Sequence, residues 1–180
     1  MALFVTTQLN AAQLTDEQQL EIKARQITKK FATELKENLQ SAIKTGGLIA
    51  GVKVCNSKAP EIAKNYSMAG WEIGRTSLKT RNTANKPTDK ENIILENFAK
   101  KQLAGQDIAS LSYSNYNTKT KQYHFMKAIP TNQICLACHG ENIAPELSNE
   151  IDKLYPSDQA KGFKLGDLRG AFSLTYKQSE

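Results

Sequence analysis

The stretch "LRGAFSLTYK", Leu168 to Lys177, carries the clearest strand pattern in the sequence. Glycine and apolar residues at the even-numbered positions alternate with mostly polar residues at the odd-numbered positions. A period of two is that of a β-strand with one covered face and one face in water. We therefore expect Phe172 and Leu174 to face a core, and Arg169 and Thr175 to face solvent.

Three further segments have strand character, and none is linked to the next by the pattern of a βαβ unit. They are "GWEIGRTSLK" (70–79), "IASLSYSNY" (108–116) and "KQYHFMKAI" (121–129), the last two forming a hairpin around residues 117–120. Without βαβ alternation, a parallel sheet is not expected. The sequence therefore predicts an α+β domain with an antiparallel sheet and helices to one side of it. A helical arm precedes this domain core in the sequence.

Two capping boxes mark the starts of helices. Residues 15–18 (TDEQ) open a long amphipathic helix that we place over 15–45, with Gly46 and Gly47 ending or bending it. An apolar segment, 48–54, then leads to Cys55, and Pro60 is expected to begin another short helix through Tyr66. Residues 88–91 (TDKE) open a helix that Gly105 ends.

Length and composition fit a single globular domain. The chain has 180 residues, of which 39% are hydrophobic and 23% charged. We assign the domain to residues 15–180, and residues 1–14 to a remnant that follows a signal region. No run approaches the roughly 20 apolar residues of a membrane span. The formal charge of +6 comes without a basic run interleaved with aromatic residues, so a nucleic-acid partner is not expected.

The stretch "QICLACHG", Gln133 to Gly140, contains the C-x-x-C-H sequence to which c-type haem is attached. In such a site Cys135 and Cys138 form thioethers with the two vinyl groups, and His139 becomes the proximal ligand of the iron. The two spacers allow one turn of backbone to present both sulfurs along one porphyrin edge. The sequence thus predicts one covalent haem c.

Two other uses of this motif compete with haem attachment. A thioredoxin-like dithiol needs its C-x-x-C after a strand of a βαβ unit, and no such unit is predicted. A structural zinc site could combine Cys55, His124, Cys135 and Cys138. Zinc sites usually pair C-x-x-C with a second close pair of ligands, whereas Cys55 and His124 are isolated in the sequence, and we therefore favour haem over zinc.

The residues alone leave the distal ligand open. Cys55, His124, Met68 and Met126 are candidates, and an empty position that admits a small gas is another alternative. A lone histidine on a strand is more often packed or exposed, and methionine more often fills a core. By the same reasoning, Cys55 could equally be a small buried apolar residue.

Four stretches in order along the chain resemble one family. They are "LIAGVKVCNSKAPEIA", "GWEIGRTSLKTRNTANKP", "IPTNQICLACHG" and "YPSDQAKGFKLGDLRGAFSL". They are similar to extracytoplasmic haem-c domains with a PAS-like fold, which occur alone as small cytochromes or ahead of histidine kinases and chemoreceptors. The resemblance implies a PAS-like α+β fold, a periplasmic or otherwise extracytoplasmic location, and Cys55 as the distal axial ligand opposite His139.

Basic residues in and just after the predicted strand at 70–79 suit the carboxylates of haem. Arg75, Lys79 and Arg81 could pair with its propionates, although a solvated basic loop is an equal alternative. We expect a redox or small-gas sensor that acts through a redox or signalling partner, with a low-potential electron carrier as the alternative function. The long N-terminal helix could also form a homodimer. No histidine–arginine pair is recognisably placed for peroxidase-like chemistry, so an enzyme is not expected.

Overall fold

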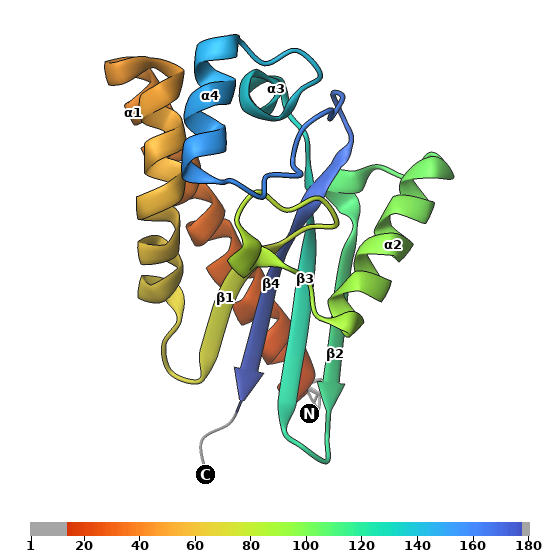
Figure 1. Cartoon of the computed structure of the whole chain (residues 1–180). Coiled ribbons are helices and arrows are strands. Elements are labelled where there is room, and N and C mark those ends of the chain that lie inside the picture. The colour runs from red at the N-terminus through yellow and green to blue at the C-terminus, as the bar shows by residue number, and fades with distance from the viewer. Residues whose placement is uncertain (1–13, 178–180) are drawn as a thin grey trace, which may run out of the picture.

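The computed structural model describes residues 14–177, which form four α-helices and one four-stranded sheet (Figure 1). Residues 1–13, most of the segment assigned to a remnant, lie outside this range. The elements are α1 (Asp16–Tyr66), β1 (Trp71–Thr76), α2 (Asp89–Leu103), β2 (Ser112–Asn117), β3 (Gln122–Pro130), α3 (Gln133–His139), α4 (Pro145–Leu154) and β4 (Leu168–Lys177). Short 3₁₀ turns precede α2 and β2, at Thr83–Asn85 and Ile108–Ser110.

The sheet has the order β1-β4-β3-β2, and every neighbouring pair is antiparallel. The last strand is therefore central, where Leu174 lies between Ile73 of β1 and Phe125 of β3. Strands β2 and β3 form the predicted hairpin. The predicted α+β, PAS-like fold class with a long N-terminal helix is confirmed.

Helix α1 is a helical hairpin with two arms. Both capping-box hydrogen bonds expected at Thr15 and Gln18 are present at its start. Gly46 and Gly47 have non-helical dihedrals, with φ of 72° at Gly47, and the chain reverses there into a second arm that runs back towards β1 (Figure 1). We call residues 16–45 the first arm and residues 48–66 the second arm. The arms touch closely near the turn, where a Cβ on Gly51 would lie 2.8 Å from Ile43.

The expected short helix from Pro60 was wrong, because the second arm is continuous from Leu48 to Tyr66 and contains Pro60 in its interior. A proline within a helix removes one backbone hydrogen bond. Burial of Ala59 and Ile62 on either side of the exposed Pro60 holds the arm together across this gap.

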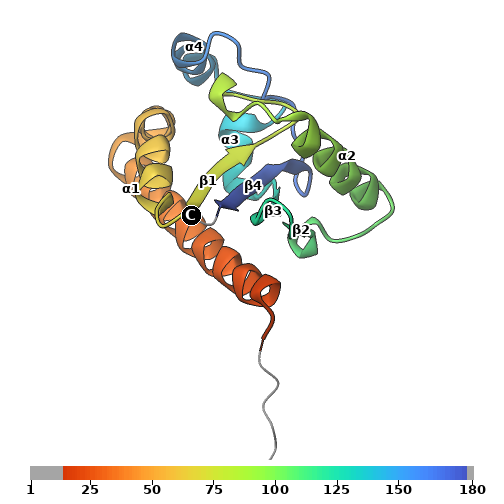
Figure 2. The ribbon, with the colours of Figure 1, turned by 90° about the horizontal axis from the view of Figure 1, so that it is seen from below.

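Helices cover both faces of the sheet, which corrects the expectation of helices on one side (Figure 2). On one face Ala24 and Phe31 of the first arm pack against Phe125 and Leu174. On the other face α2 packs against a second apolar layer that consists of Met126, Ala128 and Ala171, together with residues around the 3₁₀ turn at Ile108. Ala171 is fully buried, so the face of β4 that was expected to be wet is covered where α2 crosses it.

The first arm thus lies across the sheet within one chain. Its stripe of apolar residues is used for this packing, as Phe31 also contacts the rings of Tyr66 and Phe172 edge-on. A homodimer through the exposed remainder of this helix stays a prediction.

No helix within residues 14–177 is long and apolar enough to span a membrane.

A β-bulge interrupts the ladder between β3 and β4. Ile129 is opposite Gly170 and Pro130 is opposite Leu168, so Arg169 has no partner residue on β3. Gly170 has a φ of 152°, and a Cβ there would collide with the carbonyl oxygen of Thr76. Bulges change the direction of the side chains beside them, and this bulge turns Arg169 away from the solvent-facing position that simple alternation predicts.

Replacing Gly170 with alanine should therefore destabilise the protein by at least about 2 kcal/mol, because the backbone conformation is strained for any L side chain and the Cβ meets a backbone oxygen. The measurement is chemical denaturation followed by circular dichroism. Gly74→Ala is the matched control on the neighbouring strand, since no atom lies within 4 Å of its added Cβ. We expect it to change stability by less than about 1 kcal/mol; equal effects of the two variants would contradict this account of Gly170.

Candidate cofactor site

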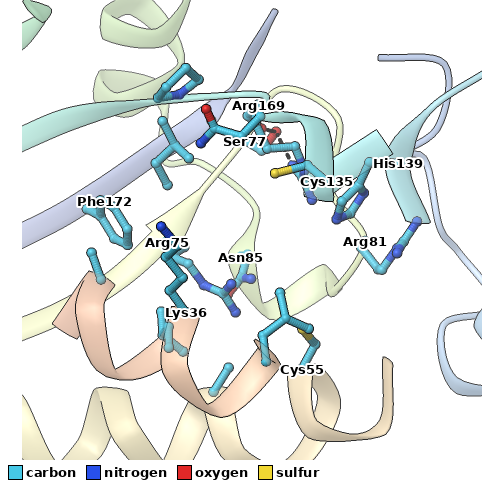
Figure 3. A pocket seen from close by; sticks show the side chains of 18 of the residues that line it. Lys36, Cys55, Arg75, Ser77, Arg81, Asn85, Cys135, His139, Arg169 and Phe172 are labelled. Atoms are coloured by element: carbon cyan, nitrogen blue, oxygen red, sulfur yellow. Dashed lines mark hydrogen bonds between the residues drawn. The ribbon is translucent and has the colours of Figure 1, made fainter. Parts of the chain in front are cut away.

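A cavity of about 760 Å³ lies between the two arms of α1, the face of the sheet that they cover, and α3. Its volume is within the range of about 300–1,000 Å³ that is typical of small-molecule and cofactor sites. Apolar walls come from both arms and from Phe125, Ile129 and Phe172. Figure 3 shows that polar and sulfur-bearing side chains from separate parts of the chain enter this space.

The C-x-x-C-H sequence forms α3, a short helix that borders the cavity and lies near the top of Figure 1. Cys135, Cys138 and His139 all line the cavity, and both thiols are free. The helix ends at Gly140, whose N–H donates to Leu136 O at 2.8 Å. A Cβ on Gly140 would lie only 2.5 Å from that oxygen, so glycine is required for this tight ending. One helical turn thereby presents two sulfurs and an imidazole to the same space.

His139 is held as a neutral imidazole with a defined tautomer. Its Nδ1 lies 2.8 Å from Ala160 O. A carbonyl can only accept, so Nδ1 carries the proton and Nε2 keeps its lone pair. Burial lowers the pKa of His139 well below its usual value, and the charges of Arg169 and Arg81 lower it further. A histidine whose Nδ1–H is bound to a carbonyl is the form typical of a metal ligand through Nε2.

Cys55 lies across the cavity from His139. Figure 3 shows its side chain rising from the second arm while those of His139 and Cys135 come from α3 on the other side. Burial raises the pKa of the Cys55 thiol, and the positive charges of Arg75, Arg81 and Arg169 oppose that rise. The structure therefore brings together the four residues that the sequence singled out as haem ligands or attachment points.

The other candidates for a distal ligand do not line this cavity. His124 lies on the opposite face of the sheet, where Nε2 is 3.1 Å from Ser173 Oγ. Met126 is fully buried under α2 on that same face, and Met68 is exposed between α1 and β1. Within residues 14–177 no group of three or more His, Cys, Asp or Glu side chains is placed to hold a metal ion, so the Cys3His zinc site is wrong.

The three basic residues predicted near the cavity have different surroundings. Arg75 and Arg81 line it, whereas Lys79 does not. The ammonium of Lys79 donates to Lys161 O at 3.3 Å and lies 5.3 Å from the centre of the Phe163 ring. Lys79 therefore supports the segment that follows α4 rather than the cavity.

Arg81 joins α3 to the segment that holds His139. Its Nη2 donates to Cys138 O at 2.5 Å and to Ala160 O at 3.2 Å. The same nitrogen lies 3.1 Å from Asp158 Oδ2, in an ion pair whose side chains are only 9% and 1% exposed. Asp158 also accepts from Ala160 N at 2.8 Å. Because Ala160 is the hydrogen-bond partner of His139, this buried pair sets the position of the imidazole.

Arg169, Asp158 and Ala160 belong to the site but were missed by sequence reasoning. Strand alternation placed Arg169 in solvent, yet the guanidinium lines the cavity. The glycine after it was the available signal, since an isolated glycine in a strand often marks a bulge. Asp158 acts through its carboxylate and Ala160 through its backbone groups, and both lie in an irregular segment for which the sequence offers no periodic pattern.

Asp158→Ala should lower the free energy of unfolding by about 3 kcal/mol, because it leaves the buried charge of Arg81 without its partner and frees the Ala160 N–H. The measurement is denaturant unfolding of the purified protein. Glu141→Ala is the control, because its ion pair with Lys164 spans 3.8 Å between side chains that are 59% and 70% exposed. We expect that variant to stay within about 0.5 kcal/mol of the original protein; a similar loss in both would mean that the Arg81–Asp158 pair has no special role.

Comparisons with known proteins agree with this geometry. The family model described as Tll0287-like matches residues 7–176. Among solved structures, the crystal structure of the cyanobacterial heme-protein Tll0287 is similar, with a TM-score of 0.63 and 25% sequence identity. The match covers 88% of this chain and 97% of that chain. No curated protein matches the chain significantly.

Proposed function

This chain belongs to the Tll0287-like family, a family of c-type haem domains, and we propose that its cavity holds one covalently bound haem c. The observation that carries the proposal is the meeting of Cys135, Cys138 and His139 on one wall with Cys55 on the opposite wall. The solved relative is itself a heme-protein by its title.

The residues of the cavity fit such a group. Its apolar walls suit a flat hydrocarbon ring, and His139 offers an unprotonated Nε2. Two guanidinium groups, those of Arg75 and Arg169, line the cavity without an ion pair among the described residues. Carboxylates of a ligand would complete the charge balance there.

Cys135 and Cys138 would attach the group. Each thiol adds across one vinyl group, so that a C–S and a C–H bond replace the S–H bond and the π bond of the alkene. The two sulfurs are one helical turn apart, and Arg81 holds α3 through its hydrogen bond to Cys138 O. One helical turn would therefore present both thiols to the same group.

His139 and Cys55 would be the two axial ligands. When bound, haem supplies an iron centre that exchanges one electron and, at an open axial position, can bind a small gas. His139 is already oriented by Ala160, while Cys55 must lose its proton to act as a thiolate. The nearby arginines favour that loss, and a thiolate opposite an imidazole favours the ferric state.

The function that this ligand pair supports best is that of a redox or small-gas sensor domain in the periplasm or another extracytoplasmic space. Cys55 lies on the second arm, which the Gly46–Gly47 turn separates from the first arm on the sheet. Release of the thiolate upon reduction would free this arm from α3. If Cys55 stays bound in both oxidation states, the closed site suits the alternative of a low-potential electron carrier.

Covalent haem is the first prediction of this proposal. Protein matured outside the cytoplasm should stain for haem after denaturing electrophoresis, because thioethers survive denaturation, and its mass should exceed that of the polypeptide by one haem. Replacing both Cys135 and Cys138 with alanine should abolish the stain. A colourless wild-type protein from a host that matures c-type cytochromes would contradict the proposal.

Cys55→Ser tests the axial ligand. The variant should keep covalent haem, because both attachment cysteines remain, but lose the low-spin thiolate absorption and show a higher reduction potential. Optical and EPR titrations of both oxidation states measure this. Met126→Leu is the control, since Met126 lies on the other face of the sheet and the change conserves volume. A Cys55→Ser protein with the wild-type spectrum and potential would show that Cys55 only packs.

A further inference from the structure

The charges that line the cavity are all positive among residues 14–177. The lining contains no Asp or Glu, and its basic residues are Arg25, Lys29, Lys36, Arg75, Arg81, Lys127 and Arg169. Five of these basic residues have a partner within the protein or are solvated. Arg25 pairs with Glu21 at 2.6 Å, Arg81 pairs with Asp158, and Lys127 donates to Ala109 O. Lys29 and Lys36 are exposed to water.

Arg75 and Arg169, which we call the arginine pair, are different. Both are partly buried, and neither forms an ion pair within the described residues. Arg169 Nη1 donates to Ser77 Oγ at 3.2 Å and to Lys79 O at 3.4 Å, which are both neutral acceptors. Its guanidinium also lies 5.1 Å from the centre of the Phe163 ring. These contacts orient the charge without neutralising it.

The local backbone conformation directs the side chain of Arg169 into the cavity. The residue sits in the β-bulge, and Gly170 is needed beside it because no Cβ would fit against Thr76. Ser77 Oγ, which accepts from Arg169 Nη1, also donates to Arg169 O at 2.7 Å. Strand irregularities near sites commonly serve to redirect one side chain.

Two partly buried guanidinium groups that lack carboxylate partners are less favourable than a pair that binds an anion. We propose that the arginine pair binds the two propionate carboxylates of the haem, and that Arg169, rather than Lys79 or Arg81, is a principal propionate-positioning residue. This inference rests on the proposed function. A guanidinium matches a carboxylate with two parallel hydrogen bonds, which an ammonium does not provide.

The proposal has an electrochemical consequence. A positive charge beside the haem favours the ferrous state, and beside a propionate it favours the ionised carboxylate. An electron supplied by the electrode would reduce the bound group, and in the pH range where a propionate titrates, up to one proton from solvent would be taken up by that propionate. Removal of one arginine should therefore lower the reduction potential. It should also move the pH range in which the potential depends on propionate protonation upward by about one to three units.

Other titratable groups that line the cavity are the three cysteines, His139 and Tyr155. They are common to the wild-type protein and the variants, so a shift that follows only the arginine changes is assigned to the carboxylates. Burial, together with the charges of Arg81 and Arg75, lowers the pKa of Arg169 to about 10. The guanidinium therefore stays charged throughout a titration from pH 5 to 9.

The experiment is spectroelectrochemical titration of the holoprotein from pH 5 to 9 for Arg169→Gln, Arg75→Gln and Arg169→Lys. Both Gln variants should show the lower potential and the shifted pH range, and Arg169→Lys should recover most of the change in potential because it keeps the charge. Arg75→Gln covers the case in which loss of the Arg169 hydrogen bonds prevents folding. Lys53→Gln is the control, because Lys53 is on the second arm, 61% exposed and paired with Glu150 outside the cavity.

Each result has a separate meaning. Unchanged potential and pH dependence in both Gln variants, with covalent haem intact, would overturn the arginine-pair proposal and leave the proposed function standing. An effect seen only in phosphate buffer would show that the pair binds inorganic anion, and would also overturn it. Wild-type protein without covalent haem would remove the proposed function and this inference together.

Discussion

The buried guanidinium of Arg81 is the interaction on which the site depends. It connects Cys138 of α3 with Ala160 and Asp158 of the segment before β4, so two parts of the chain that are not neighbours in any ladder are fixed relative to each other. Backbone bonds from Gly162 to Gly140 and from Phe163 to His139 add to this connection. A short helix such as α3 has little stability of its own. Its orientation is therefore a property of the segment that surrounds it, and mutations far from the cysteines can disturb the site.

The two faces of the sheet differ in what they contact. Beneath α2, small residues and Met126 form an apolar layer. On the face covered by α1, Phe31, Tyr123 and Phe125 belong to a packed cluster, and the cavity begins beside it at Phe125. Stability thus comes from one face and part of the other, and the remaining surface is available for a cofactor. This division explains how a domain with a large internal cavity can keep a well-packed core.

Local patterns in the sequence predicted what depends on local structure. The capping boxes at Thr15 and Thr88 and the hairpin of β2 and β3 are present as predicted, and the single backbone turn expected at C-x-x-C-H is part of the short helix α3. The failures involve distant partners. Alternation along β4 could not reveal that α2 covers Ala171 or that a bulge redirects Arg169, since both depend on strands and helices elsewhere. Likewise, His124 and Met126 were excluded as ligands only by the face of the sheet on which they lie.

The two walls of the cavity are far apart in the sequence, and this has a consequence for maturation. Under the proposed function, attachment would need only the short motif on α3, whereas Cys55 would line the cavity only once the second arm has docked on β1 and α4. Short-range structure forms before contacts between distant segments. A cofactor can thus be joined to an incompletely folded chain, and coordination by Cys55 would be the last event. The colour of the iron would then report completion of folding, and any later separation of the second arm from α3 would change the same signal.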